Sequence, residues 1–521
     1  MTADEILMEP VGSGTTINLS LISHTNAGKT TLARTLLGRD VGEVRDAAHV
    51  TEVASGHVVV QAGEDTLMLW DTPGFGDTAR LLKRLRVSGN PIGWLLSEVW
   101  DRWRERPLWS SQQAVKNARD HADVILYLIN ASEDPAAAAY VDLEMEVLAW
   151  IGKPVILLLN QMGPPREGID KEVEAWRAHL SGWEAVAGAL PLDAFARCWV
   201  QEGALLAAVE PLLPPDKAPA MTRLSQRWME LVHGRFEQSM AALAKPLAEA
   251  ARDKEAVGGK GWRDQMAQLL SAAKGESPEM RAAMERLSGR LAAGTLQSTE
   301  ALTALHGLSG KATRTVLERV GDDFARSEQA NEGFAAAIGG VMTGAVTGLA
   351  ADVMAGGLTL GGGMIVGAIL GAVGAGGLAR GFNLVRGEDG SSVRWSEEFF
   401  AGIVNAAILR YLAVAHFGRG RGDWEEAEHP AFWVEVVEKA VGERREDLKR
   451  IYEGLRAGDD PAHDAALEAL LAERTALVLA RLYPTAASAK ALAEKHDFEP
   501  VAVEEQGDST GPYVSSWMPP L

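Results

Sequence analysis

Eight consecutive residues near the amino end of the chain carry the strongest chemical signal in the sequence. They read Ser23-His24-Thr25-Asn26-Ala27-Gly28-Lys29-Thr30. An apolar stretch at 17–22 precedes them and a good helix former at 31–37 follows, which predicts a strand, a glycine-bearing turn and a helix N-terminus. In such a loop, backbone N–H groups surround phosphates, Lys29 reaches the terminal phosphates, and the Thr30 hydroxyl holds Mg²⁺. Ser23 stands where the first glycine of this motif belongs.

A second motif supports this interpretation. It reads Trp70-Asp71-Thr72-Pro73-Gly74 and closes an apolar, strand-like stretch that begins at residue 67. Nucleotide hydrolases with a phosphate-binding loop need a strand-end aspartate to hold Mg²⁺ and a glycine whose N–H meets the γ-phosphate. Asp71 and Gly74 are the candidates for these two roles.

A threonine between the two motifs should close over Mg²⁺ and the γ-phosphate. Thr51 is the only threonine between residues 36 and 65, so elimination selects it. The predicted metal ligands are Thr30, Thr51 and Asp71. The predicted catalytic residues are Lys29, Thr51 and Gly74.

The third expected element reads the nucleotide base. An apolar strand at 155–159 is followed by Asn160, which matches the start of the Asn-Lys-x-Asp motif of guanine-nucleotide hydrolases. Gln161 replaces the lysine and Gly163 replaces the aspartate that accepts from guanine, so we expect a loss of guanine selectivity on the order of 1–3 kcal/mol. Asp193 could substitute, but the sequence does not place it. The predicted nucleotide-binding residues are Asn26, Ala27, Gly28, Lys29, Thr30, Thr31, Asn160 and Gln161.

Taken together, these motifs resemble the Era-like class of bacterial GTPases. More narrowly, the chain is similar to the bacterial GTPase family with a C-terminal domain of unknown function. Two segments carry that resemblance, Ala355-Gly356-Gly357-Leu358-Thr359-Leu360-Gly361 and His416-Phe417-Gly418-Arg419-Gly420-Arg421-Gly422. The resemblance implies a P-loop GTPase domain that binds GTP or GDP with Mg²⁺, followed by a helical domain for which membrane association is an option.

The resemblance also bears on mechanism. Asn26 matches the position at which potassium-stimulated Era-like GTPases use an asparagine, which raises the hypothesis of K⁺ dependence; the alternative is an asparagine that bonds its own backbone. Phe75 stands where Ras-like enzymes have a water-orienting glutamine, so hydrolysis should be slow without a cation, a partner subunit or a second copy of the chain. Arg419 and Arg421 could complete the site, bind anionic lipid, or simply lie in an exposed loop.

Composition sets the limits of this hypothesis. The chain has 521 residues, which predicts more than one domain. Its net charge of −20 argues against a general nucleic-acid binder, because no broad positive field would attract phosphate backbones. The single cysteine, Cys198, excludes an internal disulfide framework, and residues 1–10 lack a signal-peptide pattern. We therefore expect a protein of the cytoplasm or of the cytoplasmic face of the inner membrane.

The first half of the chain must supply the elements that position these residues. Strand-like runs alternate with helical stretches, which is typical of a mostly parallel α/β sheet with helices on both faces. The runs lie at 17–22, 58–61, 67–70, 124–129 and 155–159. A Trp-rich insertion at 80–109 has apolar residues at helical spacing and could pack on the domain or bind a membrane or partner. The proline pair at 214–215 ends this domain, predicted as residues 1–215.

A mainly α-helical domain is predicted for residues 216–495, followed by a loosely ordered acidic tail at 496–521. Its first helix should present one apolar face made of Leu224, Trp228, Leu231, Val232, Phe236, Met240 and Leu243. Between 334 and 379, 14 residues are glycine and 11 are alanine, and Asp352 is the only charge. This segment could be a hairpin that enters a membrane or one that is buried in a soluble domain, because glycine and alanine contribute little transfer energy.

These features lead to one main hypothesis and two alternatives. The main hypothesis is a GTPase switch whose nucleotide state changes how the helical half engages a membrane or a partner. An interaction protein that binds nucleotide without hydrolysing it is the first alternative, favoured by Phe75. An ATP-using P-loop enzyme is the second, because the acidic base reader is missing at Gly163.

Overall fold

The computed structural model describes most of the chain, in stretches separated by gaps. The described residues are 14–24, 27–37, 54–76, 78–86, 106–160, 169–192, 198–257, 278–308, 382–387, 390–416, 431–484 and 486–496. Several sequence-based predictions lie outside them. These are the predictions for Asn26, Thr51, Gln161, Gly163, Asp193, Arg419, Arg421, the hairpin at 334–379, the middle of the Trp-rich insertion (87–105) and the tail from 497.

A six-stranded sheet forms the first half of the protein. Its strands run in the order β2-β3-β1-β4-β5-β6, and all neighbours pair in parallel except β2 and β3, which form an antiparallel edge. The strands are β1 (Thr16–Ser23), β2 (Ser55–Ala62), β3 (Asp65–Asp71), β4 (Val124–Asn130), β5 (Val155–Asn160) and β6 (Val186–Pro191). The mostly parallel α/β prediction is confirmed. The strand β6 is not predicted from the sequence, because its run Val-Ala-Gly-Ala-Leu-Pro has small residues and no alternation.

Helices cover both faces of this sheet. Alternation along β4 sends Leu126 and Leu128 to one hydrophobic cluster and Ile125, Tyr127 and Ile129 to the other. The second cluster includes residues of α2 (Thr78–Leu85), α4 (Arg106–Asp120), α5 (Ala139–Ile151) and α6 (Ile169–His179). The helices α2 and α4 are the two described ends of the Trp-rich insertion. On the opposite face lie α1 (Lys29–Leu37), α7 (Trp199–Val209) and the start of the helical half.

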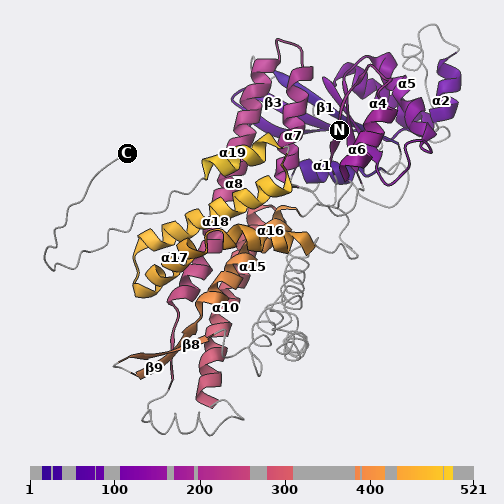
Figure 1. Ribbon diagram of the computed structural model, residues 1–521. Coiled ribbons are helices and arrows are strands. Elements are labelled where there is room, and N and C mark those ends of the chain that lie inside the picture. The colour runs from indigo at the N-terminus through magenta and orange to yellow at the C-terminus, as the bar shows by residue number, and fades with distance from the viewer. Residues whose placement is uncertain are drawn as a thin grey trace, which may run out of the picture.

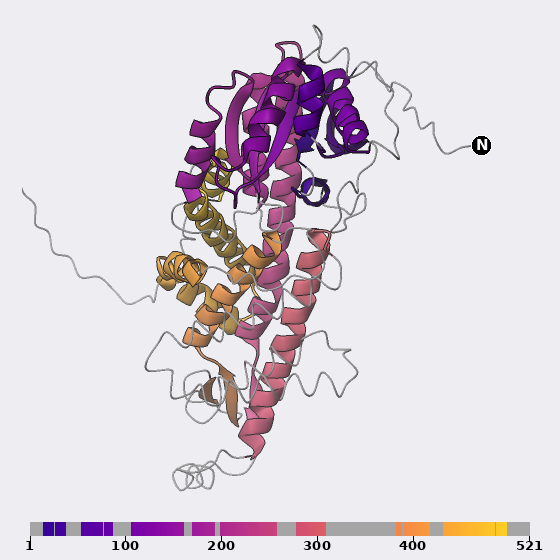
Figure 2. The ribbon, with the colours of Figure 1, turned by 90° about the vertical axis from the view of Figure 1, so that its right-hand side faces the viewer.

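The second half of the protein is mainly helical, as predicted, and extends away from the sheet (Figure 1; Figure 2 gives the side view). After the short η1 (Glu210–Leu212) comes α8 (Ala218–Arg252), whose 35 residues span about 50 Å. The other helices are α10 (Pro278–Leu305), α15 (Glu397–Ala415), α16 (Ala431–Gly442), α17 (Arg445–Ala457), α18 (Pro461–Leu482) and α19 (Ala487–Lys495). A small sheet of order β7-β9-β8 lies at the far end, formed by β7 (Glu255–Val257), β8 (Phe382–Gly387) and β9 (Gly390–Trp395).

Local sequence explains where several of these helices begin. Ser396 precedes α15 in extended backbone, and its hydroxyl accepts a hydrogen bond from the Phe399 N–H at 3.1 Å. Asp460 does the same for α18 through the Ala462 N–H at 2.9 Å, with Pro461 as the first helical residue. These caps satisfy backbone donors that a helix N-terminus otherwise leaves unpaired.

The helix α8 joins the two halves of the protein. Most of its predicted apolar face is buried in one continuous cluster with residues of β1, α1, α7, α15 and α18. Leu231 is the exception, with 45% of its surface exposed, because it lies at the edge of that face beside a cavity between the two halves. At the start of α8, Arg223 pairs with Asp65 at 2.7 Å. Just before it, Lys217 pairs with Asp123 at 2.8 Å.

By length and composition, α15 could cross a membrane, and it is the only helix of this kind among the described residues. Its most apolar stretch is 56% buried inside the protein, and core helices of soluble proteins have the same length and composition. Tyr411 of α15 is fully enclosed, packs edge-on against Phe236, and accepts a hydrogen bond from the Trp199 indole at 3.1 Å. The structure therefore explains the apolar sequence of α15 as a central helix of the helical half.

Candidate functional site

The candidate residues gather at the carboxyl ends of neighbouring parallel strands. Ser23 ends β1, Asp71 ends β3 and Asn160 ends β5. Because β1, β3, β4 and β5 run in the same direction, these ends meet at one edge of the sheet, where open α/β sheets bind their ligands. The N-terminus of α1 lies at the same edge and directs its backbone N–H groups there.

The turn before α1 depends on a glycine. Gly28 has φ of +92°, a conformation that residues with a side chain rarely adopt. A Cβ atom built on Gly28 would lie 2.9 Å from the Asn160 side-chain nitrogen. That nitrogen donates to the Ala27 carbonyl at 2.9 Å, and Asn160 is fully buried. The structure thus brings Ala27, Gly28 and Asn160 together, and places Asn160 as a brace for the phosphate-binding loop.

The side chain of Lys29 turns back toward the end of β1. Its ammonium donates to the Ser23 hydroxyl at 2.8 Å and to the His24 carbonyl at 3.4 Å. Burial lowers the pKa of Lys29 to about 8, against the opposing effects of the Asp71 and Glu144 carboxylates. Ser23 therefore supplies a hydrogen-bond partner to the buried ammonium, which the usual glycine could not do.

Thr30 and Asp71 meet as the sequence predicts. The Thr30 hydroxyl donates to the Asp71 carboxylate at 2.7 Å, although the two residues are 41 positions apart. A hydroxyl and a carboxylate are hard oxygen ligands of the kind that Mg²⁺ takes beside nucleotide phosphates. The pair therefore fits a Mg²⁺ ion, with Thr30 next to the helix N-terminus and Asp71 at the strand end.

The loop after Asp71 is attached to the end of β1. Thr72 donates through its hydroxyl to the Leu21 carbonyl at 2.5 Å, and the Phe75 N–H donates to the Ser23 carbonyl at 2.9 Å. Gly74 is buried between these two anchors. Phe75 is fully enclosed in the core formed with α2, α4 and α5. Its ring is thus a packing group, and it cannot orient a water molecule.

Thr31 is also buried, and its carbonyl accepts from the Thr35 hydroxyl at 2.7 Å, so it supports α1 from within. The remaining predicted nucleotide and metal residues, Asn26, Thr51 and Gln161, lie outside the described residues. Within the described part, the structure brings together Lys29, Thr30, Asp71, Gly74 and Asn160 at one edge of the sheet.

A buried carboxylate that the sequence does not predict lies beside this site. Glu144 of α5 is fully buried, and its Oε1 lies 2.6 Å from the His24 Nδ1. The Thr78 hydroxyl donates to the same oxygen at 3.1 Å, and the Tyr127 hydroxyl donates to Oε2 at 2.6 Å. The only sequence signal for Glu144 is its place within a largely apolar helix. This signal is weak, because a glutamate in such a helix usually points to solvent.

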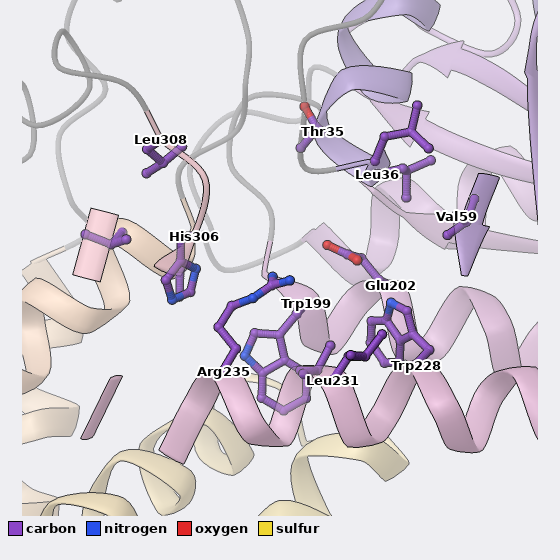
Figure 3. Close-up of a pocket in the computed structure, with 14 residues that line it drawn as sticks. Thr35, Leu36, Val59, Trp199, Glu202, Trp228, Leu231, Arg235, His306 and Leu308 are labelled. Atoms are coloured by element: carbon purple, nitrogen blue, oxygen red, sulfur yellow. The ribbon is translucent and has the colours of Figure 1, made fainter. Parts of the chain in front are cut away.

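A separate cavity lies between the two halves of the protein. Its volume is about 130 Å³, and residues of α1, β2, α7, α8 and α15 line it together with His306 and Leu308, which follow α10. Figure 3 shows Arg235, Glu202 and His306 around the same space.

Family comparisons agree with this geometry. A family model described as "50S ribosome-binding GTPase" matches residues 18–161, the segment that holds Lys29, Asp71 and Asn160. A second model, described as "Domain of unknown function (DUF3482)", matches residues 189–479, more than half of the chain. The chain belongs to this family. This member of the DUF3482 family has a P-loop GTPase domain followed by a mainly helical domain. The predicted resemblance is confirmed.

Solved structures show weaker similarity to this DUF3482 chain. A variant of Era from Aquifex aeolicus bound to GDP and AlF₄⁻ is 20% identical, with a TM-score of 0.28 over 38% of this chain and 57% of that one. Era in complex with MgGDPNP and a segment of 16S ribosomal RNA is 18% identical, with a TM-score of 0.28 over 39% and 58%. The SsGBP–GDP complex is 15% identical, with a TM-score of 0.25 over 39% and 52%. The chain thus spans less than two thirds of the length of these structures.

Proposed function

We propose that this protein is a molecular switch that binds GTP with Mg²⁺, hydrolyses it slowly, and passes its nucleotide state to the helical domain. The observation that carries the proposal is the convergence of Lys29, the Thr30–Asp71 pair and the Gly28 turn at one edge of the sheet. Phosphate recognition, metal binding and a helix N-terminus are thereby combined at one place.

Each described residue of the site has a role in this proposal. The Lys29 ammonium moves from Ser23 to the terminal phosphates, and the backbone N–H groups after Gly28 bind the phosphate oxygens. Thr30 and Asp71 hold Mg²⁺, which when bound neutralises charge on the phosphate oxygens. Gly74 offers its N–H to the γ-phosphate, and Asn160 keeps the loop in shape through Ala27.

The buried Phe75 is the reason to propose slow hydrolysis. Since its ring fills the core, it leaves the water-orienting role to another group, such as a cation, a partner protein or a second copy of the chain. The same observation favours a second candidate function, a nucleotide-binding interaction protein that does not turn GTP over.

We propose that the protein acts in the cytoplasm or at the cytoplasmic face of the inner membrane. In this proposal the segment 334–379 contacts the membrane, and K⁺ at Asn26 stimulates GTP hydrolysis. The net charge of −20 supports a partner other than nucleic acid. Each proposal can be tested by adding one component to the same nucleotide-binding and turnover assay: liposomes, K⁺ in place of Na⁺, or RNA.

The decisive experiment measures binding and turnover with purified protein. Lys29→Ala should lower affinity for fluorescent GDP and GTP analogues about tenfold to 100-fold, as expected for a lost hydrogen bond to a charged group. Lys116→Ala is the matched control, because Lys116 is an exposed lysine on α4. Unchanged binding in Lys29→Ala would reject this loop as the site. Phosphate release from GTP and from ATP then separates the switch from the non-hydrolysing and ATP-using alternatives.

A further inference from the structure

Three segments of the GTPase domain contact one buried carboxylate. Glu144 of α5 accepts from Thr78, the first residue of α2, and from Tyr127 of β4, and it contacts His24 directly after β1. Its side chain has no exposed surface. A buried carboxylate is costly unless several donors satisfy it, and these three contacts provide that satisfaction.

Two of the three partners belong to segments that meet the phosphates in the proposed function. His24 is the second residue of the phosphate-binding loop, and its carbonyl accepts from Lys29 at 3.4 Å. Thr78 begins α2, directly after the loop that contains Asp71 and Gly74. Glu144 therefore links the start of α2 to His24, whose carbonyl is one of the two partners of the Lys29 ammonium.

Tyr127, the third partner, binds the Glu144 carboxylate from a strand of the sheet. Tyr127 is fully buried on β4, and burial together with Glu144 raises the pKa of its hydroxyl well above the usual value. The phenol therefore stays protonated and donates to Glu144. Since β4 is a central strand of the sheet, it holds the Oε2 end of the carboxylate, while Oε1 faces His24 and Thr78.

We infer that Glu144 is a positioning residue that couples the start of α2 to the phosphate-binding loop, so that the protein distinguishes GTP from GDP through the Thr78–Glu144–His24 contact. This inference rests on the proposed function. A γ-phosphate that moves the Gly74 loop pulls on Thr78, and the pull changes the hydrogen bond at Glu144. The other end of α2 is held differently, because Arg86 pairs there with the partly exposed Glu146 at 2.5 Å.

The test compares affinities of the full-length protein for GDP and for a non-hydrolysable GTP analogue. Thr78→Val removes the hydroxyl and keeps the side-chain volume, and it should change the ratio of the two dissociation constants about fivefold, the worth of one net hydrogen bond. Thr78→Ser restores the hydroxyl and should restore the ratio. Arg86→Ala removes an ion pair to Glu146 of α5 that does not involve Glu144, and it should leave the ratio unchanged.

Glu144→Gln is the second variant, because it keeps the size of the side chain and replaces one acceptor oxygen with a donor. We expect it to change the same ratio, whereas a merely structural role would lower the melting temperature and leave the ratio alone. Wild-type ratios in both Thr78→Val and Glu144→Gln would overturn the inference. Absence of guanine-nucleotide binding by the unsubstituted protein would instead overturn the proposed function together with it.

Discussion

Ser23 shows how a single exchange is accommodated in the phosphate-binding loop. The usual glycine would leave the buried Lys29 ammonium with backbone partners, whereas the Ser23 hydroxyl accepts from it at 2.8 Å and donates to the His24 carbonyl at 2.6 Å. Gly28 does not tolerate such an exchange, because a Cβ at this position would press on the Asn160 side chain. The loop can therefore dispense with glycine at its first position but not at its sixth.

Gly28→Ala should be damaging for two separable reasons. The positive φ costs about 1 kcal/mol for any residue with a Cβ, and the added methyl group would also displace Asn160 from Ala27. We expect a lower melting temperature together with a loss of nucleotide affinity of about tenfold or more, measured with a fluorescent GDP analogue.

Gly63→Ala is the matched control for this substitution. Gly63 has φ of +61° in the turn between β2 and β3, and a Cβ there meets nothing within 4 Å. It should lower stability without changing nucleotide affinity. Equal affinities in Gly28→Ala and wild-type protein would contradict the role assigned to the Asn160 brace.

At this scale the sequence singled out several residues that the structure brings together at one edge of the sheet. Lys29, Thr30 and Asp71 could be found because their spacing relative to strands and helices is a fixed requirement of phosphate binding. Glu144 could not, since its contact with His24 joins residues 120 positions apart and no local pattern marks it. The brace formed by Asn160 was missed for the same reason, because only the fold brings its amide to the Ala27 carbonyl.

Among the elements, α15 depends on a histidine that must stay uncharged. His416 caps the end of this helix, with Nδ1 at 2.7 Å from the Leu412 carbonyl and Nε2 at 2.7 Å from the Tyr483 hydroxyl. The first contact requires a proton on Nδ1, so a neutral ring accepts the Tyr483 hydrogen bond through Nε2. Burial lowers the pKa of His416 from 6.5 to about 4.

This depressed pKa predicts acid sensitivity of the helical half. Between pH 6.5 and about 4 the unfolded chain binds a proton that the folded chain does not, so the contribution of His416 is complete above pH 6.5 and is lost as the pH falls. The full loss is about 3 kcal/mol. Urea unfolding at several pH values should therefore show a shallower slope in His416→Phe than in wild type. The exposed His121→Phe is the control, and an unchanged slope in His416→Phe would refute the assignment.

Helix existence was predictable at the element scale, but helix partners were not. The apolar spacing of 224–243 predicts one buried face of α8, and the structure places most of it in the core. Spacing alone does not say which neighbour covers that face, so the exposure of Leu231 beside the interdomain cavity could not be foreseen. Likewise, the composition of β6 is too poor in β-branched residues to indicate a strand.

At the scale of the whole molecule, the two halves share one core. A single hydrophobic cluster runs from Leu21 of β1 through Trp228 of α8 to Leu412 of α15. Ion pairs of Lys217 and Arg223 with the sheet add to this contact at the beginning of α8. An α/β domain followed by helices was predictable from the order of elements, whereas this shared core depends on α8 lying across the sheet, which no local pattern specifies.

The shared core predicts that nucleotide binding stabilises both halves together. If one cooperative unit unfolds, calorimetry should give a single main transition, and Mg²⁺ with GDP at 100 times its dissociation constant should stabilise that whole transition by about 2.7 kcal/mol. Arg223→Ala removes the ion-pair partner of the buried Asp65 and should lower the midpoint of the transition without splitting it. Trp228→Ala, which removes a large side chain from the shared core, should cost about 3–5 kcal/mol and is the variant most able to separate the halves. Two wild-type transitions, of which GDP shifts only one, would show that the halves are independent and that the shared core does not carry the nucleotide signal.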